Sequence, residues 1–189
     1  MRVFISGGCK NGKSYFAQRL AKAQDNCGDL YYIATMKPVD EEDDERIERH
    51  KSERAGWGFS TVEHPVNIEN ILGKCNVYGS FILDSITALL ANEMFGRDGG
   101  GGNIDLAGGK TLNGLLQVVN NIKNIVIVSD YIYSDAVFYD KTTERYRQTL
   151  AKIDRIVANK CDAVAEAAYS NLLIHKGGKM FGDLYEKIL

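Results

Sequence analysis

The chain has 189 residues, of which 44% are apolar and 25% are charged, and its formal net charge is −2. It is therefore an ordinary soluble chain, long enough for one α/β domain with a full core. The near-neutral charge provides no overall basic surface, so we do not expect nucleic acid as a partner.

The four cysteines and the apolar segments exclude further classes. Cys9, Cys27, Cys75 and Cys161 form no C-x-x-C pair and no histidine lies at metal-ligand spacing from them, so we predict neither a zinc site nor a disulfide framework. Reduced thiols are typical of cytosolic proteins. No apolar run approaches the length of a membrane span, and we predict a cytoplasmic protein.

The first predicted element is a strand over residues 2–6, followed by a phosphate-binding loop. The segment Gly7–Ser14 reads GGCKNGKS and fits the pattern G-x-x-x-x-G-K-[ST]. In such a loop the backbone N–H groups bind phosphates at a helix N-terminus, Lys13 reaches the β and γ oxygens, and Ser14 ligates Mg²⁺. The alternative is a chance glycine-rich turn with a solvated lysine, which the preceding strand disfavours.

The remaining elements alternate between strand and helix. We predict helices over 13–23, 40–54, 66–72, 86–95, 110–122 and 142–160, and strands over 30–35, 61–64, 80–84, 124–129, 163–167 and 172–175. This alternation predicts an α/β fold of the P-loop (RecA-like) class: one three-layer domain over residues 1–189 with a mostly parallel central sheet. Its ligand should lie at the carboxyl ends of the strands.

A charged helix is predicted over residues 40–54. Its acidic residues precede its basic ones, and several acid–base pairs lie four residues apart, which is typical of a solvated helix. On spacing alone, His50 in this helix is a surface residue.

Two aspartates follow buried strands and are candidates for the Mg²⁺ shell that a phosphate loop requires. Asp84 follows Phe81-Ile82-Leu83, and Asp130 follows the strand 124–129. We favour Asp84. Its alternative role is to cap the following helix, because aspartate caps helices well.

The segment Gly96–Gly109 contains seven glycines and few apolar residues. It is too short for a domain linker, and we predict a mobile surface loop. It is either an active-site lid or a tolerated insertion, and the sequence does not distinguish the two.

Four segments together resemble one family. The phosphate loop, Tyr32-Ile33-Ala34-Thr35, Arg46-Ile47 with His50-Lys51-x-x-Arg54, and Leu83-Asp84-Ser85-Ile86-Thr87 resemble, in order and spacing, the bifunctional adenosylcobinamide kinase and adenosylcobinamide-phosphate guanylyltransferase of cobalamin biosynthesis. The resemblance covers the chain well to about Phe95, and its most specific element is the His-Lys-x-x-Arg box.

The resemblance implies that His50 attacks the α-phosphate of GTP and carries GMP to a corrinoid phosphate, with Lys13 and Asp84 as further catalytic residues. Neutral imidazole suits this role, because its ring nitrogen is nucleophilic near neutral pH. Ser14 and Asp84 would hold Mg²⁺, GTP or ATP would be the phosphoryl donor, adenosylcobinamide the acceptor, and the assembly a homotrimer. The implied nucleotide-binding residues are Gly7, Gly8, Cys9, Lys10, Asn11, Gly12, Lys13, Ser14, Ala34, Thr35, Met36, Lys51, Ser52, Glu53, Arg54, Glu63 and Asp84.

Several positions depart from the family. Asp84 stands where the family usually has glutamate, Asp154-Arg155 replace its Asn-Gln, and Ser129–Phe138 replaces its Asn-Glu-Val-Gly loop. Aromatic residues in the altered loop either line a corrinoid pocket or pack in the core. Two alternatives therefore stay open, namely a paralogue with another acceptor and a GTP-binding regulatory module that transfers nothing.

Overall fold

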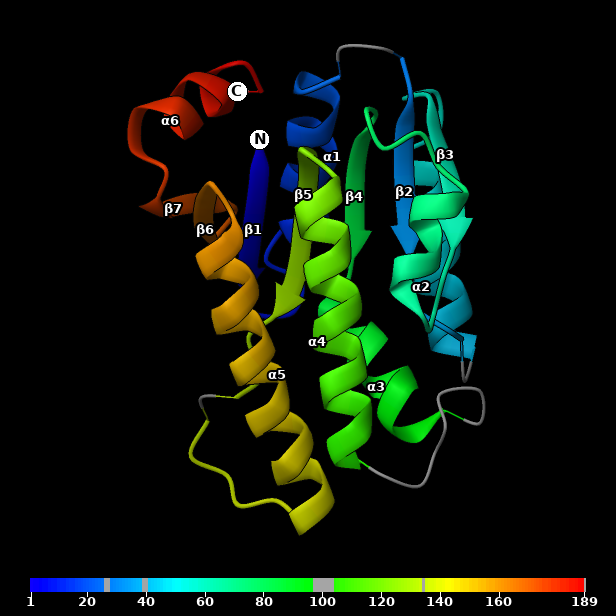
Figure 1. Cartoon of the computed structure of the whole chain (residues 1–189). Helices are drawn as coiled ribbons and strands as arrows, with labels where there is room; N and C mark the ends of the chain where they lie inside the picture. Colours follow the sequence, from blue (N-terminus) through cyan, green and yellow to red (C-terminus); the bar gives the residue numbers. More distant parts are fainter. Residues whose placement is uncertain (26–27, 39–40, 97–103, 134, 189) are drawn as a thin grey trace.

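The computed structural model describes residues 1–25, 28–38, 41–96, 104–133 and 135–188. A seven-stranded sheet with the order β3-β2-β4-β5-β1-β6-β7 forms the centre of the fold. All neighbouring strands are parallel except β6 and β7, which are antiparallel. Helices cover both faces of this sheet (Figure 1). The predicted α/β P-loop class with a mostly parallel sheet is confirmed.

The strands are β1 (Arg2–Gly7), β2 (Leu30–Ala34), β3 (Phe59–Glu63), β4 (Ser80–Asp84), β5 (Asn124–Asp130), β6 (Ala163–Ala168) and β7 (Asn171–Lys176). The helices are α1 (Lys13–Ala23), α2 (Glu41–Glu53), the 3₁₀ helix η1 (Ile68–Gly73), α3 (Ile86–Phe95), α4 (Ile104–Asn121), α5 (Lys141–Lys160) and α6 (Gly178–Glu186).

The core has two halves, one on each face of the sheet. Along β4, Phe81 and Leu83 point to the face covered by α3, α4 and α5, whereas Ile82 points to the face covered by α1 and α6. This two-sided burial explains why the central strands are continuous apolar runs without polar alternation. Since β1, β4 and β5 are parallel neighbours in register, their carboxyl ends meet at one edge of the sheet, where the phosphate loop begins.

The predicted loop over Gly96–Gly109 is partly wrong. Residues 97–103 lie outside the described residues, but α4 begins at Ile104 and includes both later glycines. A Cβ atom at Gly108 would come within 2.6 Å of the Thr149 methyl on α5, so glycine allows the close approach of the two helices. Gly108 is therefore a helix-packing glycine and not a loop glycine.

The helix α6 was not predicted. It begins with two glycines, which disfavour a helix, and it buries only Phe181 and Leu184 against the α1 face of the sheet. Tertiary packing of these two side chains outweighs the weak local preference.

Three findings bear on the remaining predictions. No helix among the described residues is long and apolar enough to cross a membrane. Cys9, Cys75 and Cys161 are free thiols, and Cys27 lies outside the described residues. That residues 1–189 form one domain stays a prediction.

Candidate active site

The phosphate loop follows β1 at the carboxyl edge of the sheet. Gly7 ends the strand against β6, where a Cβ atom would collide with the carbonyl oxygen of Ala167, so only glycine fits. Gly12 then serves as the N-cap of α1 in a left-handed conformation. The predicted strand–loop–helix context is therefore present, and the N-terminus of α1 is directed at the loop.

Lys13 is buried and bridges the loop to the end of β5. Its ammonium group donates to the carbonyl oxygens of Gly7 and Gly8 at 3.1 and 2.7 Å, and lies 2.7 Å from a carboxylate oxygen of Asp130. Only 6% of the residue is exposed. The cation is thus held inside the loop by three oxygen atoms, where it can meet phosphate oxygens.

Ser14 lies beside Asp84 at the end of β4. Its hydroxyl donates to Oδ2 of Asp84 at 2.8 Å. A hydroxyl and a carboxylate oxygen are the ligand types that Mg²⁺ takes beside nucleotide phosphates, so the pair fits this metal. Asp84 does not cap α3, because the hydroxyl of Ser85 accepts from the N–H of Ala88 in that role. The two rival aspartates therefore have different partners: Asp84 contacts Ser14, and Asp130 contacts Lys13.

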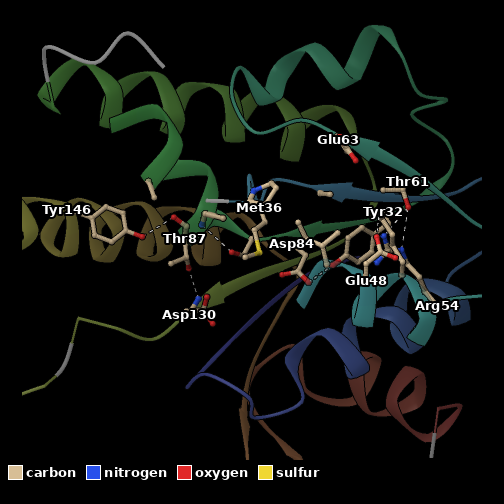
Figure 2. A pocket seen from close by; sticks show the side chains of 17 residues that line it. Tyr32, Met36, Glu48, Arg54, Thr61, Glu63, Asp84, Thr87, Asp130 and Tyr146 are labelled. Carbon is tan, nitrogen blue, oxygen red and sulfur yellow. Dashed lines mark hydrogen bonds and ion pairs between the residues drawn. The ribbon is translucent and has the colours of Figure 1, made fainter. Parts of the chain in front are cut away.

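A cavity of about 560 Å³ opens next to these carboxylates (Figure 2). Its size is in the range of small-molecule sites, roughly 300–1,000 Å³. Asp84 and Asp130 form part of its wall, α2 and β3 supply one end, and Thr87 and Tyr146 supply the other. Its lining residues are Tyr32, Ala34, Met36, Pro38, Ile47, Glu48, Lys51, Arg54, Thr61, Glu63, Asp84, Ser85, Thr87, Ala88, Ala91, Asp130 and Tyr146.

The helix α2 presents one face to this cavity. Ile47 and Lys51 line it, four residues apart as expected for neighbours on one helical face, and Arg54, directly after the end of the helix, lines it too. Position 50 is three residues after Ile47 and four before Arg54 on the helix backbone. The side chain of His50 lies outside the described residues.

Arg54 is buried in a stack with Tyr32. Its guanidinium carbon lies 4.0 Å from the centroid of the Tyr32 ring, and its Nη2 donates to the hydroxyl of Thr61 at 3.1 Å. Its Nη1 is buried and has no hydrogen-bond partner among the described residues. A buried cationic donor at the cavity wall is suited to an anionic or carbonyl oxygen of a ligand.

The other residues implied by the resemblance divide into two groups. Ala34, Met36 and Glu63 line the cavity. Thr35 is fully buried and its hydroxyl is used within the protein, donating to the carbonyl oxygen of Ser85 at 2.8 Å. Ser52 is exposed and its hydroxyl donates to the carbonyl oxygens of its own helix. The side chain of Glu53 lies outside the described residues.

Three residues of the site were not predicted as site residues. Tyr32 donates its hydroxyl to Oδ2 of Asp84 at 2.7 Å, Thr87 accepts from the backbone N–H of Asp130 at 2.8 Å, and Tyr146 donates to the carbonyl oxygen of Thr87 at 2.9 Å. Burial raises the pKa of Tyr146, which keeps its phenol a donor. Each belongs to a segment that the family shares, but only the fold places it at the cavity.

A buried carboxyl lies behind the site. Asp154 of α5 is 3% exposed and accepts from the Ser129 hydroxyl at 2.8 Å. Burial raises the pKa of Asp154 to about 7, the nearby charge of Asp130 adds to this, and hydrogen bonds from Ser129 and Tyr133 act in the opposite direction. A protonated aspartate side chain has a hydrogen-bond donor and an acceptor oxygen, as the amide of asparagine does. This similarity accounts for an aspartate where the family has asparagine.

The aromatic run after β5 does not form core. Tyr131, Phe138 and Tyr139 are exposed, at 47%, 101% and 43%, and only Tyr133 packs against the core. None of the four lines the cavity. The buried Arg147 holds this loop by donating to the carbonyl oxygen of Ile132 and to Asp135.

The sequence matches the model of a known protein family. A family model described as cobinamide kinase / cobinamide phosphate guanyltransferase matches residues 3–169. The chain belongs to this family. The match extends beyond the N-terminal half on which the resemblance rested, and it ends at the junction of β6 and β7.

Two curated relatives are similar in sequence. A bifunctional adenosylcobalamin biosynthesis protein, CobP, of Pseudomonas aeruginosa is 28% identical over 176 residues, which cover 87% of this chain and 91% of that protein. The bifunctional protein CobU of Escherichia coli is 29% identical over 100 residues, covering 52% of this chain and 53% of that one. Among solved structures, the flagellar accessory protein FlaH of Methanocaldococcus jannaschii is 14% identical, with a TM-score of 0.48 over 93% of this chain and 77% of that chain.

Lys13→Ala is expected to weaken GTP binding by about 100-fold or more, because it removes the buried cation that would contact the phosphates. Calorimetric titration of GTP measures the effect. Lys22→Ala, on the exposed side of the same helix, is the control and should bind GTP as the wild type does. Unchanged affinity in Lys13→Ala would show that this loop is not the phosphate site.

Asp84→Asn is expected to remove the dependence of nucleotide binding on Mg²⁺. The wild type should bind GTP more tightly with Mg²⁺ than with a chelator, and the variant should bind equally in both, since the amide is a poor Mg²⁺ ligand. Asp130→Asn is the comparison, and it should keep the Mg²⁺ dependence. Equal loss in both variants would contradict the assignment of the metal to the Ser14–Asp84 pair.

Asp154→Asn is expected to stabilise the protein at about pH 8. The folded pKa of Asp154, about 7, exceeds the ordinary value of 3.8, so the wild type binds this proton more tightly when folded. Its stability therefore falls as the pH rises from about 4 to about 7, whereas asparagine does not titrate. The free energy of unfolding in urea should favour the variant by up to about 4 kcal/mol at pH 8 and by little at pH 4. Asp183→Asn, at an exposed carboxyl, should show no such trend.

Proposed function

We propose that the protein carries out both reactions of its family, phosphorylation of adenosylcobinamide and transfer of GMP to the resulting phosphate. The proposal is supported by the arrangement of residues around the cavity. Asp130 and Asp84, which contact Lys13 and Ser14 of the loop, form part of the cavity wall, and Lys51 of α2 and the following Arg54 lie at one end of the same cavity. A triphosphate in the loop and a nucleophile from α2 would thus meet over the same cavity.

In the proposed kinase step, the corrinoid hydroxyl oxygen attacks the γ-phosphorus of a nucleoside triphosphate. The bond from this phosphorus to the bridging oxygen breaks, and the nucleoside diphosphate leaves. Lys13 and the loop N–H groups stabilise the charge that develops on the leaving group. We assign the hydroxyl to Asp130, because Asp84 with Ser14 is the pair that fits Mg²⁺, whereas Asp130 lines the same cavity and contacts Lys13 through Oδ1 only. The hydroxyl proton would pass to Asp130 and then to solvent.

In the proposed transferase step, a ring nitrogen of His50 attacks the α-phosphorus of GTP and pyrophosphate leaves. The phosphate of the acceptor then attacks the same phosphorus, the phosphorus–nitrogen bond breaks, and the imidazole is restored. The backbone position of residue 50, one turn from Ile47 and from Arg54, supports this role. Arg54, with its buried unpartnered Nη1, is suited to bind an oxygen of the nucleotide.

Mg²⁺ fits the Ser14–Asp84 pair, where it would supply charge neutralisation for the phosphates. Among the described residues, no group of three or more histidine, cysteine, aspartate or glutamate side chains forms a metal site. A hydroxyl with a single carboxylate is the donor set expected for a metal that arrives with a nucleotide. The homotrimer and the cytoplasmic location stay predictions.

The altered loop Ser129–Phe138 supports one alternative, a paralogue that acts on another acceptor. Its exposed aromatic residues Tyr131 and Phe138, with the adjacent Tyr139, would meet a large acceptor outside the cavity, and the loop differs from the family sequence. Acceptor identity therefore has to be tested separately from nucleotide chemistry.

His50→Ala is expected to abolish covalent labelling by GTP. The wild type incubated with GTP and Mg²⁺ should gain one GMP in an acid-labile, base-stable bond and release pyrophosphate, as a phosphoramidate requires. Intact-protein mass spectrometry measures the label. Phosphorylation of adenosylcobinamide should persist in the variant, because the γ-phosphate passes directly to the hydroxyl.

His175→Ala is the matched control for this experiment, since His175 lies on β7, is exposed and pairs with Glu166. It should label as the wild type does. Labelling of the wild type without transfer to adenosylcobinamide phosphate would favour the paralogue. GTP binding without any label would leave the regulatory module as the function.

A further inference from the structure

The turn between β6 and β7 has an unusual residue in an unfavourable conformation. Ala168 pairs with Asn171, so Tyr169 and Ser170 alone connect the strands. Both have positive φ, 50° and 57°, as in a type I′ hairpin. That turn favours Asn and Gly, and a bulky residue there costs about 1 kcal/mol or more.

Packing does not offset this cost. The side chain of Tyr169 is 93% exposed, so the ring gains nothing from the described part of the chain. Large aromatic side chains normally contribute through burial or through a ligand. The fold therefore gives no reason for a tyrosine at this position.

The position of the turn gives a reason for a tyrosine at residue 169. In the register of β1 and β6, Gly7 pairs with Ala167, and Tyr169 follows two residues later, roughly 7 Å further along the strand direction. The turn thus lies at the same carboxyl edge as the phosphate loop that follows Gly7, on the side of β1 away from β5.

The strand order also shows on which side of the phosphate loop the acceptor side of the site lies. Asp130 on β5 and Asp84 on β4 lie on one side of β1, and the cavity lies with them. In the proposed kinase step the acceptor hydroxyl meets the γ-phosphate at this side. With its γ-phosphate at this side, an extended donor would place its nucleoside on the opposite side of the loop, toward β6 and its turn.

We propose that the ring of Tyr169 stacks on the purine base of the nucleoside triphosphate that serves as phosphoryl donor. The inference rests on the proposed kinase step for the direction of the nucleotide. In the transferase step the α-phosphate faces α2, and the guanosine then occupies the cavity. The two reactions therefore place the nucleoside on opposite sides of the same loop, and only the first uses Tyr169.

The test compares Tyr169→Asn with Tyr169→Phe. Asparagine suits the turn, so the first variant should fold, while the second keeps the ring. Calorimetry with a non-hydrolysable ATP analogue should show roughly tenfold or greater loss of affinity in Tyr169→Asn and no loss in Tyr169→Phe, since base stacking on an aromatic ring contributes at this level. Inorganic tripolyphosphate, which has no base, should bind all three proteins equally.

GMP labelling by GTP separates this inference from the proposed function. Tyr169→Asn should label at the wild-type rate, because the guanosine lies on the other side of the loop. Unchanged affinity for the ATP analogue, an equal loss for tripolyphosphate, an equal loss in Tyr169→Phe, or slowed labelling would each overturn the assignment. A wild type that binds the analogue but phosphorylates no adenosylcobinamide would refute the kinase proposal and leave the stacking measurement valid.

Discussion

The site depends on the attachment of the first turn of α1 to two strand ends. Lys13 is ion-paired with Asp130 at the end of β5, and Ser14 is hydrogen-bonded to Asp84 at the end of β4. These contacts join residues that are 117 and 70 positions apart in the chain. They are made between charged or polar groups that are largely buried, where each unpaired partner would be costly. These contacts thus fix the first turn of α1 against the ends of β5 and β4.

Around this attachment, much of the remaining polar structure fixes the cavity walls. The hydroxyl of Thr35 ties the end of β2 to Ser85, and the side chain of Asn92 on α3 donates to the carbonyl oxygens of Thr35 and Pro65. Such bonds position backbone segments without facing a ligand. They explain how the segment Tyr32-Ile33-Ala34-Thr35 can contribute to the site while its threonine stays fully buried.

The sequence predicted the elements near the phosphate loop well because their signals are local. The limits of α1, β4 and α3 agree with the predicted ranges, and Asp84 lies beside Ser14 as expected. Predictions failed where long-range packing decides, as for Gly108 against Thr149 and for α6. Likewise, no local pattern distinguishes Tyr32, which lies at the cavity, from Tyr31, which stacks on Phe81 in the core. The two side chains differ only because successive residues of a strand point to opposite faces of the assembled sheet.

The side chain of Tyr32 belongs to both halves of the site. Its hydroxyl donates to Asp84, and its ring supports the guanidinium of Arg54. A ligand that competes for Oδ2 of Asp84 leaves the ring held only by its stacking, and a ligand that draws Arg54 away uncovers the ring. In the proposed function, filling the loop and filling the α2 end of the cavity are therefore energetically coupled through one residue, with the same coupling free energy in either order of binding.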